Sequence, residues 1–250
     1  MEKIRCGLLG EKLGHSRSPE IHAQLGDYEY LLYEKRPEEL ENFLREASWR
    51  GMNITIPYKK TVLQWMDELS PVAANIGSVN TIIRREDGSL YGDNTDTYGF
   101  EALVHLSGFR MADRKVLVLG SGGASASVCE ALRRLNAVPV VISRTGENNY
   151  QNLECHEDAA YVINTTPVGM VPHTEEAPLD LTRVPGCCGL LDLIYNPPET
   201  RLMTQAGRLG IPAFNGLYML VAQAWKAAEL FLNSEIPEDR AEEIYRRMQA

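Results

Sequence analysis

Two short stretches of the sequence bring lysines and aspartates to places where they could share a proton. In MNITIPYKK an apolar run ends at Pro57, and Lys59 and Lys60 follow it directly. In YGDNTDTYG the acids Asp93 and Asp96 stand among Gly, Asn and Thr, a composition typical of a backbone that bends around a ligand. A lysine beside an aspartate can stabilise and protonate an oxygen on which charge develops. By spacing alone, a solvated pair of lysines is the simpler interpretation.

Two serines precede a predicted helix near the N-terminus. Ser16 and Ser18 lie in a polar loop after the apolar run 4–9, and Pro19 follows Ser18. Serine at the N-cap and proline at the first helical position are typical of a helix start. Hydroxyls at such a point can bind ligand oxygens. The alternative, that Ser18 only caps the helix, is equally open.

A glycine turn stands between a strand and a helix in the middle of the chain. The run VLVLG is rich in β-branched residues and leucine, and SGGA and a helical pattern over 125–135 follow it. A backbone without side chains can approach a pyrophosphate, whose charge is favoured by the free N–H groups of a helix N-terminus. Gly120 and Gly122 fit the first two positions of G-x-G-x-x-G, whereas Ser125 occupies the third.

The next strand, 138–142, ends in Ser143, Arg144 and Thr145. An NAD site usually has an acid at this place, which binds the ribose 2′-hydroxyl. An arginine and a threonine suit a 2′-phosphate instead, so these residues favour NADP over NAD. A solvent-exposed arginine at a strand end is the alternative interpretation.

The order of elements predicts an α/β protein of two domains that would position these residues. Predicted strands are 4–9, 28–33, 52–56, 79–84, 89–91, 116–120, 138–142, 160–164 and 189–193, and predicted helices are one from 18 and others at 38–47, 60–69, 71–76, 97–106, 125–135, 200–210, 217–232 and 237–248. We predict a substrate domain at 1–100, with a mainly parallel sheet, completed by C-terminal helices at 217–250. A Rossmann-like dinucleotide-binding domain takes 101–216. Within it, 146–157 is short for a crossover helix.

The composition argues against several classes of protein. Of the 250 residues, 44% are hydrophobic and 24% charged, as in ordinary globular proteins. A formal net charge of −9 argues against nucleic-acid binding and favours a small-molecule partner. Five cysteines without C-x-x-C spacing predict neither disulfides nor a metal site. No apolar run is long enough for a membrane span and the N-terminus does not suit a signal peptide, so we expect a cytoplasmic protein. The sequence does not decide between a monomer and a homodimer.

Taken together, the motifs resemble those of the shikimate dehydrogenase family. The resemblance runs from Gly14 to Gln223 and includes, in the family's order, GHSRSPEIH, NITIPYKK, GSVNT, GDNTDTYG, GSGGA, SRT, NTTPVGM, DLIYNPPET and GLYMLVAQA. It implies the reversible, NADPH-dependent reduction of 3-dehydroshikimate to shikimate in aromatic amino-acid biosynthesis. The ordered set is specific, whereas a single block such as the glycine turn is not.

The resemblance also implies roles for residues. It selects Lys59 and Asp96 as the catalytic pair, and leaves Lys60 on the surface and Asp93 outside the pair. The residues implied to bind substrate are Ser16, Ser18, Asn53, Thr55, Asn80, Tyr195 and Gln223. The residues implied to bind the cofactor are Gly120, Ser121, Gly122, Gly123, Ala124, Arg144, Thr145 and Gly216.

Some positions depart from the family's pattern. Ala23 and Ser143 each stand where many members have asparagine, and Ala126 stands where many have a basic residue. The last change and the segment 146–148 weaken the expected preference for NADP, so NAD stays possible.

Three other functions are weighed against this one. A relative that oxidises quinate or an amino-substituted shikimate with NAD is the nearest alternative. A catalytically silent cofactor-binding regulator would not need the Lys59 and Asp96 pair. A folate dehydrogenase of similar two-domain plan would not need the serine loop.

Overall fold

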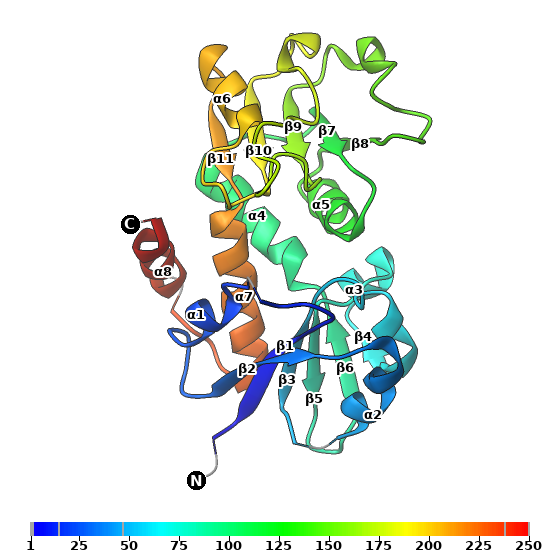
Figure 1. Cartoon of the computed structure of the whole chain (residues 1–250), viewed down its shortest axis with the longest axis vertical. Helices are drawn as coiled ribbons and strands as arrows, with labels where there is room; N and C mark the ends of the chain where they lie inside the picture. Colours follow the sequence, from blue (N-terminus) through cyan, green and yellow to red (C-terminus); the bar gives the residue numbers. More distant parts are fainter. Residues whose placement is uncertain (1–2, 15, 47, 238, 250) are drawn as a thin grey trace. The chain divides into compact units, whose positions relative to one another are not determined.

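The structure is a computed structural model that describes residues 3–14, 16–46, 48–237 and 239–249. The chain divides into two compact units. Unit 1 comprises Met1–Gly99 and Leu220–Ala250, and unit 2 comprises Phe100–Met219. Each unit contains its own β-sheet with helices around it, which confirms the predicted α/β fold class (Figure 1).

Unit 1 is built on a mixed six-stranded sheet in the order β2-β1-β3-β5-β6-β4. Its elements are β1 (Arg5–Gly10), α1 (Ser18–His22), β2 (Glu29–Glu34), the 3₁₀ helix η1 (Pro37–Glu39), α2 (Leu40–Arg45), β3 (Gly51–Ile54), the 3₁₀ helix η2 (Thr61–Trp65), β4 (Glu68–Leu69), α3 (Pro71–Ile76), β5 (Thr81–Arg84), β6 (Leu90–Asp93) and α8 (Asp239–Gln249). The pairs β1 with β2, β1 with β3 and β4 with β6 are parallel. The pairs β3 with β5 and β5 with β6 are antiparallel. The sheet is therefore mainly parallel, as predicted.

Helices cover both faces of this sheet. On one face, α7 (Leu217–Leu232), which runs on from unit 2, packs the ring of Phe231 against Gly51 and against His22 of α1. On the other face, Phe43 of α2 and Val62 of η2 belong to one core cluster with Met52 of β3. Figure 1 shows α7 in orange beside β1 and β2, and α2 and α3 in blue and cyan on the other side. Burial on both faces is what a near-continuous apolar strand such as β1 requires.

The predicted helix at 60–69 is wrong. The structure has the short η2 there, followed by strand β4. Asp67 exchanges bonds with Leu90 at the start of β6, because its N–H donates to the Leu90 carbonyl (2.9 Å) and its Oδ2 accepts the Leu90 N–H (2.8 Å). Pairing with a strand distant in sequence therefore overrides the local helical pattern.

Unit 2 is built on a parallel five-stranded sheet in the order β11-β10-β9-β7-β8. Its elements are β7 (Lys115–Leu119), α5 (Gly123–Arg134), β8 (Val138–Ile142), the 3₁₀ helix η3 (Leu153–His156), β9 (Tyr161–Asn164), the 3₁₀ helix η4 (Leu181–Arg183), β10 (Gly189–Asp192), α6 (Arg201–Arg208) and β11 (Ala213–Asn215), and α4 (Thr95–Ser107) enters it from unit 1. The strand order reverses between β7 and β9, which is where sheets of this kind bind ligands. The connection from β8 to β9 contains only the 3₁₀ helix η3. This confirms the prediction that the segment is too short for a crossover helix.

Candidate active site

The lysine and aspartate selected by the motifs meet in unit 1. Lys59 follows β3, and Asp96 lies in the first turn of α4. The Nζ of Lys59 donates to Oδ2 of Asp96 over 2.5 Å, and the two side chains are 20% and 13% exposed. Lys60 is exposed, and Asp93 instead accepts a hydrogen bond from Ser70 Oγ at 2.5 Å. The structure thus joins one lysine and one aspartate and keeps the other two out of the pair.

Asn80 holds the second oxygen of the aspartate. Its Nδ2 donates to Asp96 Oδ1 over 2.8 Å. Its own carbonyl oxygen accepts the backbone N–H of Thr95 at 2.7 Å and the hydroxyl of Thr81 at 2.9 Å, which fixes the orientation of the amide. Asn80 is only 2% exposed. Both oxygens of Asp96 therefore have a donor, and the carboxylate is held in place before any ligand binds.

Asn53 belongs to the same network through β3. It is 5% exposed, and its Nδ2 donates to Thr81 Oγ1 over 3.1 Å. Its Oδ1 accepts the hydroxyl of Tyr30 at 2.8 Å. Thr55 follows the strand and is half-buried, and strand alternation directs it to the same side as Asn53. Thr81 hydrogen-bonds to both Asn53 and Asn80, so one hydroxyl connects two predicted substrate residues.

Ser16 and Ser18 form a pair of hydroxyls before and at the start of α1. Ser16 Oγ donates to Ser18 Oγ over 3.1 Å and accepts the Ser18 N–H at 3.2 Å. The interpretation of Ser18 as the N-cap is wrong, because the helix begins at Ser18 itself and the cap is Arg17, with no side-chain cap bond. The Ser18 hydroxyl therefore does not cap the helix. Its oxygen accepts the hydrogen bond from Ser16 Oγ instead.

The other two predicted substrate residues stand on a helix and after a strand. Gln223 is half-buried in α7 within unit 1, and its Nε2 donates to the Leu220 carbonyl of its own helix at 2.8 Å. Tyr195 is half-buried in unit 2, after β10.

The predicted pyrophosphate turn joins β7 to α5. Gly120 has φ +104°, and a Cβ there would lie 3.0 Å from Thr165 Oγ1, so this position requires glycine. A Cβ on Gly122 or Gly123 would meet open space, so the fold does not fill the room in front of these residues. Gly122 to Ala124 form the start of α5, and Ser121 is exposed just before it. An open, glycine-lined helix N-terminus at the strand-order reversal fits the phosphates of a dinucleotide.

The remaining predicted cofactor residues differ in their surroundings. Arg144 and Thr145 are exposed after β8. Gly216 is buried, and a Cβ there would lie 2.1 Å from the carbonyl oxygen of Leu193. Its N–H donates to the Ile194 carbonyl over 3.1 Å. The close approach of two backbones therefore explains Gly216 without a ligand, whereas an exposed arginine has room for a phosphate.

Three residues that position the candidate site were missed by the sequence reasoning. Tyr30, Thr81 and Thr95 hold Asn53 and Asn80 through the bonds given above. Thr95 and Thr81 each lie within a quoted motif, which was the available signal, whereas Tyr30 lies in a predicted strand and carried none.

A buried aspartate in unit 2 was missed as well. Asp192, at the end of β10, has no exposed surface. It accepts hydrogen bonds from Thr200 Oγ1 (2.7 Å) and Asn164 Nδ2 (2.9 Å). Burial raises the pKa of its carboxyl, and these donors oppose that shift. Asp192 therefore connects the end of β9 with the loop after β10.

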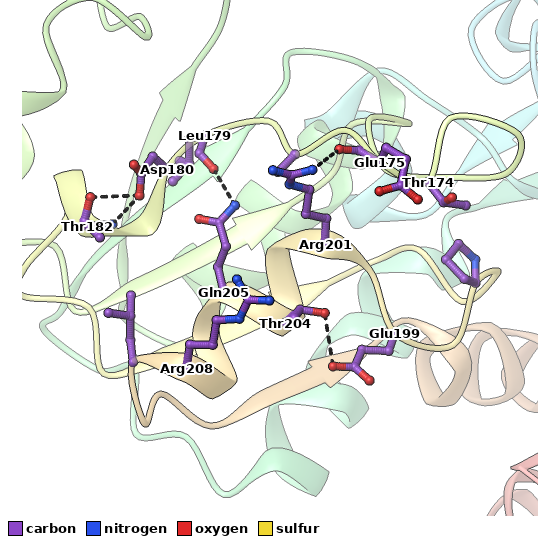
Figure 2. A pocket seen from close by; sticks show the side chains of 13 residues that line it. Thr174, Glu175, Leu179, Asp180, Thr182, Glu199, Arg201, Thr204, Gln205 and Arg208 are labelled. Carbon is purple, nitrogen blue, oxygen red and sulfur yellow. Dashed lines mark hydrogen bonds between the residues drawn. The ribbon is translucent and has the colours of Figure 1, made fainter.

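A surface cavity of about 1090 Å³ lies within unit 2. Figure 2 shows it between α6 and the chain before η4, with Arg208 and Gln205 on the helix side. Arg201 donates to the Glu175 carbonyl there over 2.9 Å. None of the predicted site residues lines this cavity, so it is separate from the candidate active site.

Two features are absent from the described residues. Over 3–14, 16–46, 48–237 and 239–249, no three His, Cys, Asp or Glu residues are grouped so that they could hold a metal ion. In the same ranges, no helix has the length and apolar character needed to cross a membrane.

Comparisons with known proteins agree with the motifs. Residues 8–82 match the model of the shikimate dehydrogenase substrate binding domain. An NADP(+) shikimate dehydrogenase of Clostridium perfringens is 36% identical, and the match covers 97% of each chain. A chorismate mutase/shikimate 5-dehydrogenase fusion protein from Clostridium acetobutylicum is similar in structure, with a TM-score of 0.93, 34% identity and coverage of 100% of this chain and 98% of the other. A shikimate 5-dehydrogenase from Thermus thermophilus, solved with NADP(H) and shikimate, has a TM-score of 0.87, 32% identity and coverage of 98% and 99%.

Proposed function

The chain belongs to the shikimate dehydrogenase family, and from this premise we propose that it reduces 3-dehydroshikimate reversibly to shikimate with NADPH, using Lys59 and Asp96 as its catalytic pair. One observation carries the assignment of the pair: Lys59 Nζ lies 2.5 Å from an aspartate oxygen whose neighbour is held by Asn80. The similarity to relatives supports the choice of substrate and cofactor. The residues of this chain support the proposed proton transfer.

Ketone reduction needs a hydride and a proton at one carbonyl group. NADPH, when bound, supplies the hydride to the carbonyl carbon. As negative charge develops on the oxygen, the Lys59 ammonium stabilises it electrostatically, and the pair of Lys59 and Asp96 delivers one proton to complete the hydroxyl. In the reverse direction the same pair takes the hydroxyl proton while hydride leaves the carbon. Because Asp96 already orients the ammonium, little reorganisation is needed during the reaction.

Other residues would bind the remaining groups of the substrate. The hydroxyl pair Ser16 and Ser18 suits its carboxylate, because hydroxyl groups donate hydrogen bonds to anionic oxygens. Asn53 and Asn80 present amides beside the catalytic pair and suit ring hydroxyls. Thr55, Gln223 and Tyr195 complete the proposed set.

The cofactor would be held by unit 2. The N-terminus of α5, with the open space in front of Gly122 and Gly123, suits the pyrophosphate. Arg144 and Thr145 are exposed and suit a 2′-phosphate, which supports NADP. Assigning unit 1 as the substrate domain and unit 2 as the cofactor domain is part of this proposal, and the cytoplasmic location and the place in aromatic amino-acid biosynthesis likewise stay predictions.

An oxidation assay tests the proposal. The purified protein is given shikimate or quinate with NADP or NAD, and formation of the reduced nicotinamide is followed by absorbance. Shikimate with NADP should give the highest kcat/KM. Faster quinate oxidation with NAD would favour the alternative substrate, and no turnover in any of the four mixtures would refute an enzyme of this class.

A further inference from the structure

A chain of hydrogen bonds crosses the carboxyl ends of two neighbouring strands in unit 2. Asp192, the last residue of β10, stands in its middle and is fully buried. Its Oδ1 accepts hydrogen bonds from Asn164 Nδ2 at the end of β9 (2.9 Å) and from the N–H of Ile194 (3.1 Å). Its Oδ2 accepts the hydroxyl of Thr200, the N-cap of α6, at 2.7 Å. Donors from three separate segments thus converge on one carboxylate.

Asn164 carries this contact into the loop after β9. The residue is fully buried, and its Oδ1 accepts both the N–H (3.0 Å) and the hydroxyl (2.7 Å) of Thr166. The Thr166 oxygen in turn accepts the N–H of Val168 at 3.2 Å. The Asn164 amide is therefore oriented by Asp192 on one side and holds the first residues of the loop on the other.

The same loop lies against the glycine turn. A Cβ on Gly120 would lie 3.0 Å from Thr165 Oγ1 and 3.0 Å from Thr166 Cγ2. Thr165 also donates to the carbonyl of Leu119, the last residue of β7, through its N–H (3.0 Å) and its hydroxyl (2.6 Å). The strand order reverses between β7 and β9, and doubly wound sheets bind ligands outside the strand ends at such a point. The loop that Asn164 holds is therefore beside the place where a dinucleotide would bind.

A buried carboxylate at this position has a cost. Burial raises the pKa of the Asp192 carboxyl, and its three hydrogen bonds oppose that shift. An apolar residue of similar size would fill the space at the end of β10 without removing a charge from water. It would also leave three buried donors without their acceptor, and the Asn164 amide would lose the bond that orients it. What the carboxylate adds over an apolar residue is thus the fixed orientation of its neighbours.

We propose that Asp192 is a positioning residue of the cofactor site, which fixes the loop 165–168 beside the glycine turn through Asn164 and the start of the loop after β10 through Ile194. This inference rests on the proposed function of unit 2 as the cofactor domain. Both loops follow the central strands of the sheet, so they bear on the part that NADP and NAD share. The 2′-phosphate, assigned above to Arg144, is not involved. The affinity for the two dinucleotides therefore depends on Asp192 to the same extent.

Hydrogen exchange of the intact wild-type protein, without cofactor, gives the first test. The N–H groups of Thr166 and Ile194 donate to Asn164 and Asp192. If these bonds order the loops before any ligand binds, both amides should exchange at least about tenfold more slowly than in an unstructured peptide of the same sequence. Exchange of both amides at the unstructured rate would overturn the proposal.

Substitution of Asp192 gives the second test, with the Kd of NADP and of NAD measured by calorimetry in the absence of shikimate. Asp192→Leu keeps the size of the side chain and removes the acceptor, so both Kd values should rise about tenfold or more, by the same factor. Asp192→Asn keeps an oxygen for Asn164 and Ile194, because the Thr200 hydroxyl can rotate to accept from the new amide. Its Kd values should stay within about threefold of the wild type. A rise for NADP alone, or an unchanged Kd in Asp192→Leu, would contradict the proposal.

Two further variants separate loop positioning from a general loss of stability. Asn164→Ala breaks the link to Thr166 from its other end and should raise both Kd values as Asp192→Leu does; unchanged values would overturn the proposal. Val162→Ala is the matched control, because it removes fully buried side-chain volume from the same strand, β9. It should lower the Tm and leave both Kd values unchanged. An equal rise in this control would assign the effect to stability and refute a positioning role.

Binding is measured without turnover, so this proposal and the proposed reaction can fail separately. Wild-type protein that binds NADP but oxidises no shikimate would refute the reaction, while the rise of Kd in Asp192→Leu would still support the positioning role. Wild-type turnover of shikimate together with an unchanged Kd in Asp192→Leu would support the reaction and refute the role of Asp192.

Discussion

Replacing Lys59 by alanine is the most direct test of the proposed chemistry. Among the described residues, the ammonium pairs with Asp96 Oδ2 at 2.5 Å, and both side chains are mostly shielded from water. The aspartate keeps its second bond, from Asn80 at 2.8 Å. Lys59→Ala therefore removes the ammonium and leaves the carboxylate in position. The substitution isolates the step that the lysine is proposed to serve.

The expected loss follows from that role. A positioned acid–base group contributes about 10²–10⁴-fold to the rate, which corresponds to about 3–5 kcal/mol of activation free energy. We expect kcat to fall by that factor and the KM for shikimate to change by less than about fivefold, because the hydroxyl and amide residues that bind substrate remain. The free energy of unfolding should fall by about 1–3 kcal/mol, because the mostly buried Asp96 carboxylate loses one of its two donors.

Steady-state kinetics of shikimate oxidation, with saturating NADP, measures both parameters. Lys60→Ala is the matched control, because it removes an adjacent lysine that is exposed, and its kcat should stay within about twofold of the wild type. Thermal unfolding of each variant checks that the fold is retained. A loss confined to KM, or an equal loss in the two variants, would refute a transition-state role for Lys59.

Three further outcomes are expected. Arg144→Ala should raise the KM for NADP about 10- to 100-fold, because it removes a charge-assisted hydrogen bond to the 2′-phosphate. The KM for NAD, which lacks that phosphate, is the internal control. An equal change in both KM values would exclude contact between Arg144 and the 2′-phosphate. Gly216→Ala, whose Cβ would lie 2.1 Å from the carbonyl oxygen of Leu193, should lower the free energy of unfolding by several kcal/mol in denaturant titrations, whereas Gly122→Ala, with open space around it, should not; equal effects would remove the packing explanation. Burial lowers the pKa of His22 to about 3, so between that value and about 6.5 the unfolded chain binds a proton that the folded chain does not. The free energy of unfolding should therefore fall as the pH falls from about 6.5, by about 2 kcal/mol at pH 5. His22→Phe should flatten this pH dependence, and an unchanged slope would show that other groups cause it.

The sequence predicted the fold class well because its strands are short apolar runs punctuated by glycine and proline. The glycine turn from Gly120 predicted β7 and α5 through local signals alone. Two local predictions failed, one because of a tertiary contact and the other because a helix begins one residue earlier than predicted. Pairing of Asp67 with Leu90 made a strand where the pattern favoured a helix, and Ser18 became the first helical residue instead of its cap. A helix boundary one residue away was enough to change the role of a hydroxyl.

The candidate site was predictable only through the motifs. Spacing offered two lysines and two aspartates and did not choose between them, because their contact joins residues far apart in the chain. Lys59 reaches Asp96 only after β3, β5 and α4 have assembled. The supporting hydrogen bond from Tyr30 to Asn53 forms because β2 and β3 both pair with β1 in the sheet. No local sequence pattern contains that strand order.

The missing helix between β8 and β9 bears on how cofactor choice depends on the solution. The pyrophosphate would have a helix N-terminus at α5, but the connection after Arg144 has only the short η3, so a 2′-phosphate there would be met by an exposed guanidinium with no helix dipole behind it. Mobile ions screen exposed charges over about 8 Å at physiological ionic strength and about 3 Å at 1 M. Added salt should therefore reduce the advantage of NADP over NAD. Cofactor discrimination in this protein would then be set by the medium as well as by the fold.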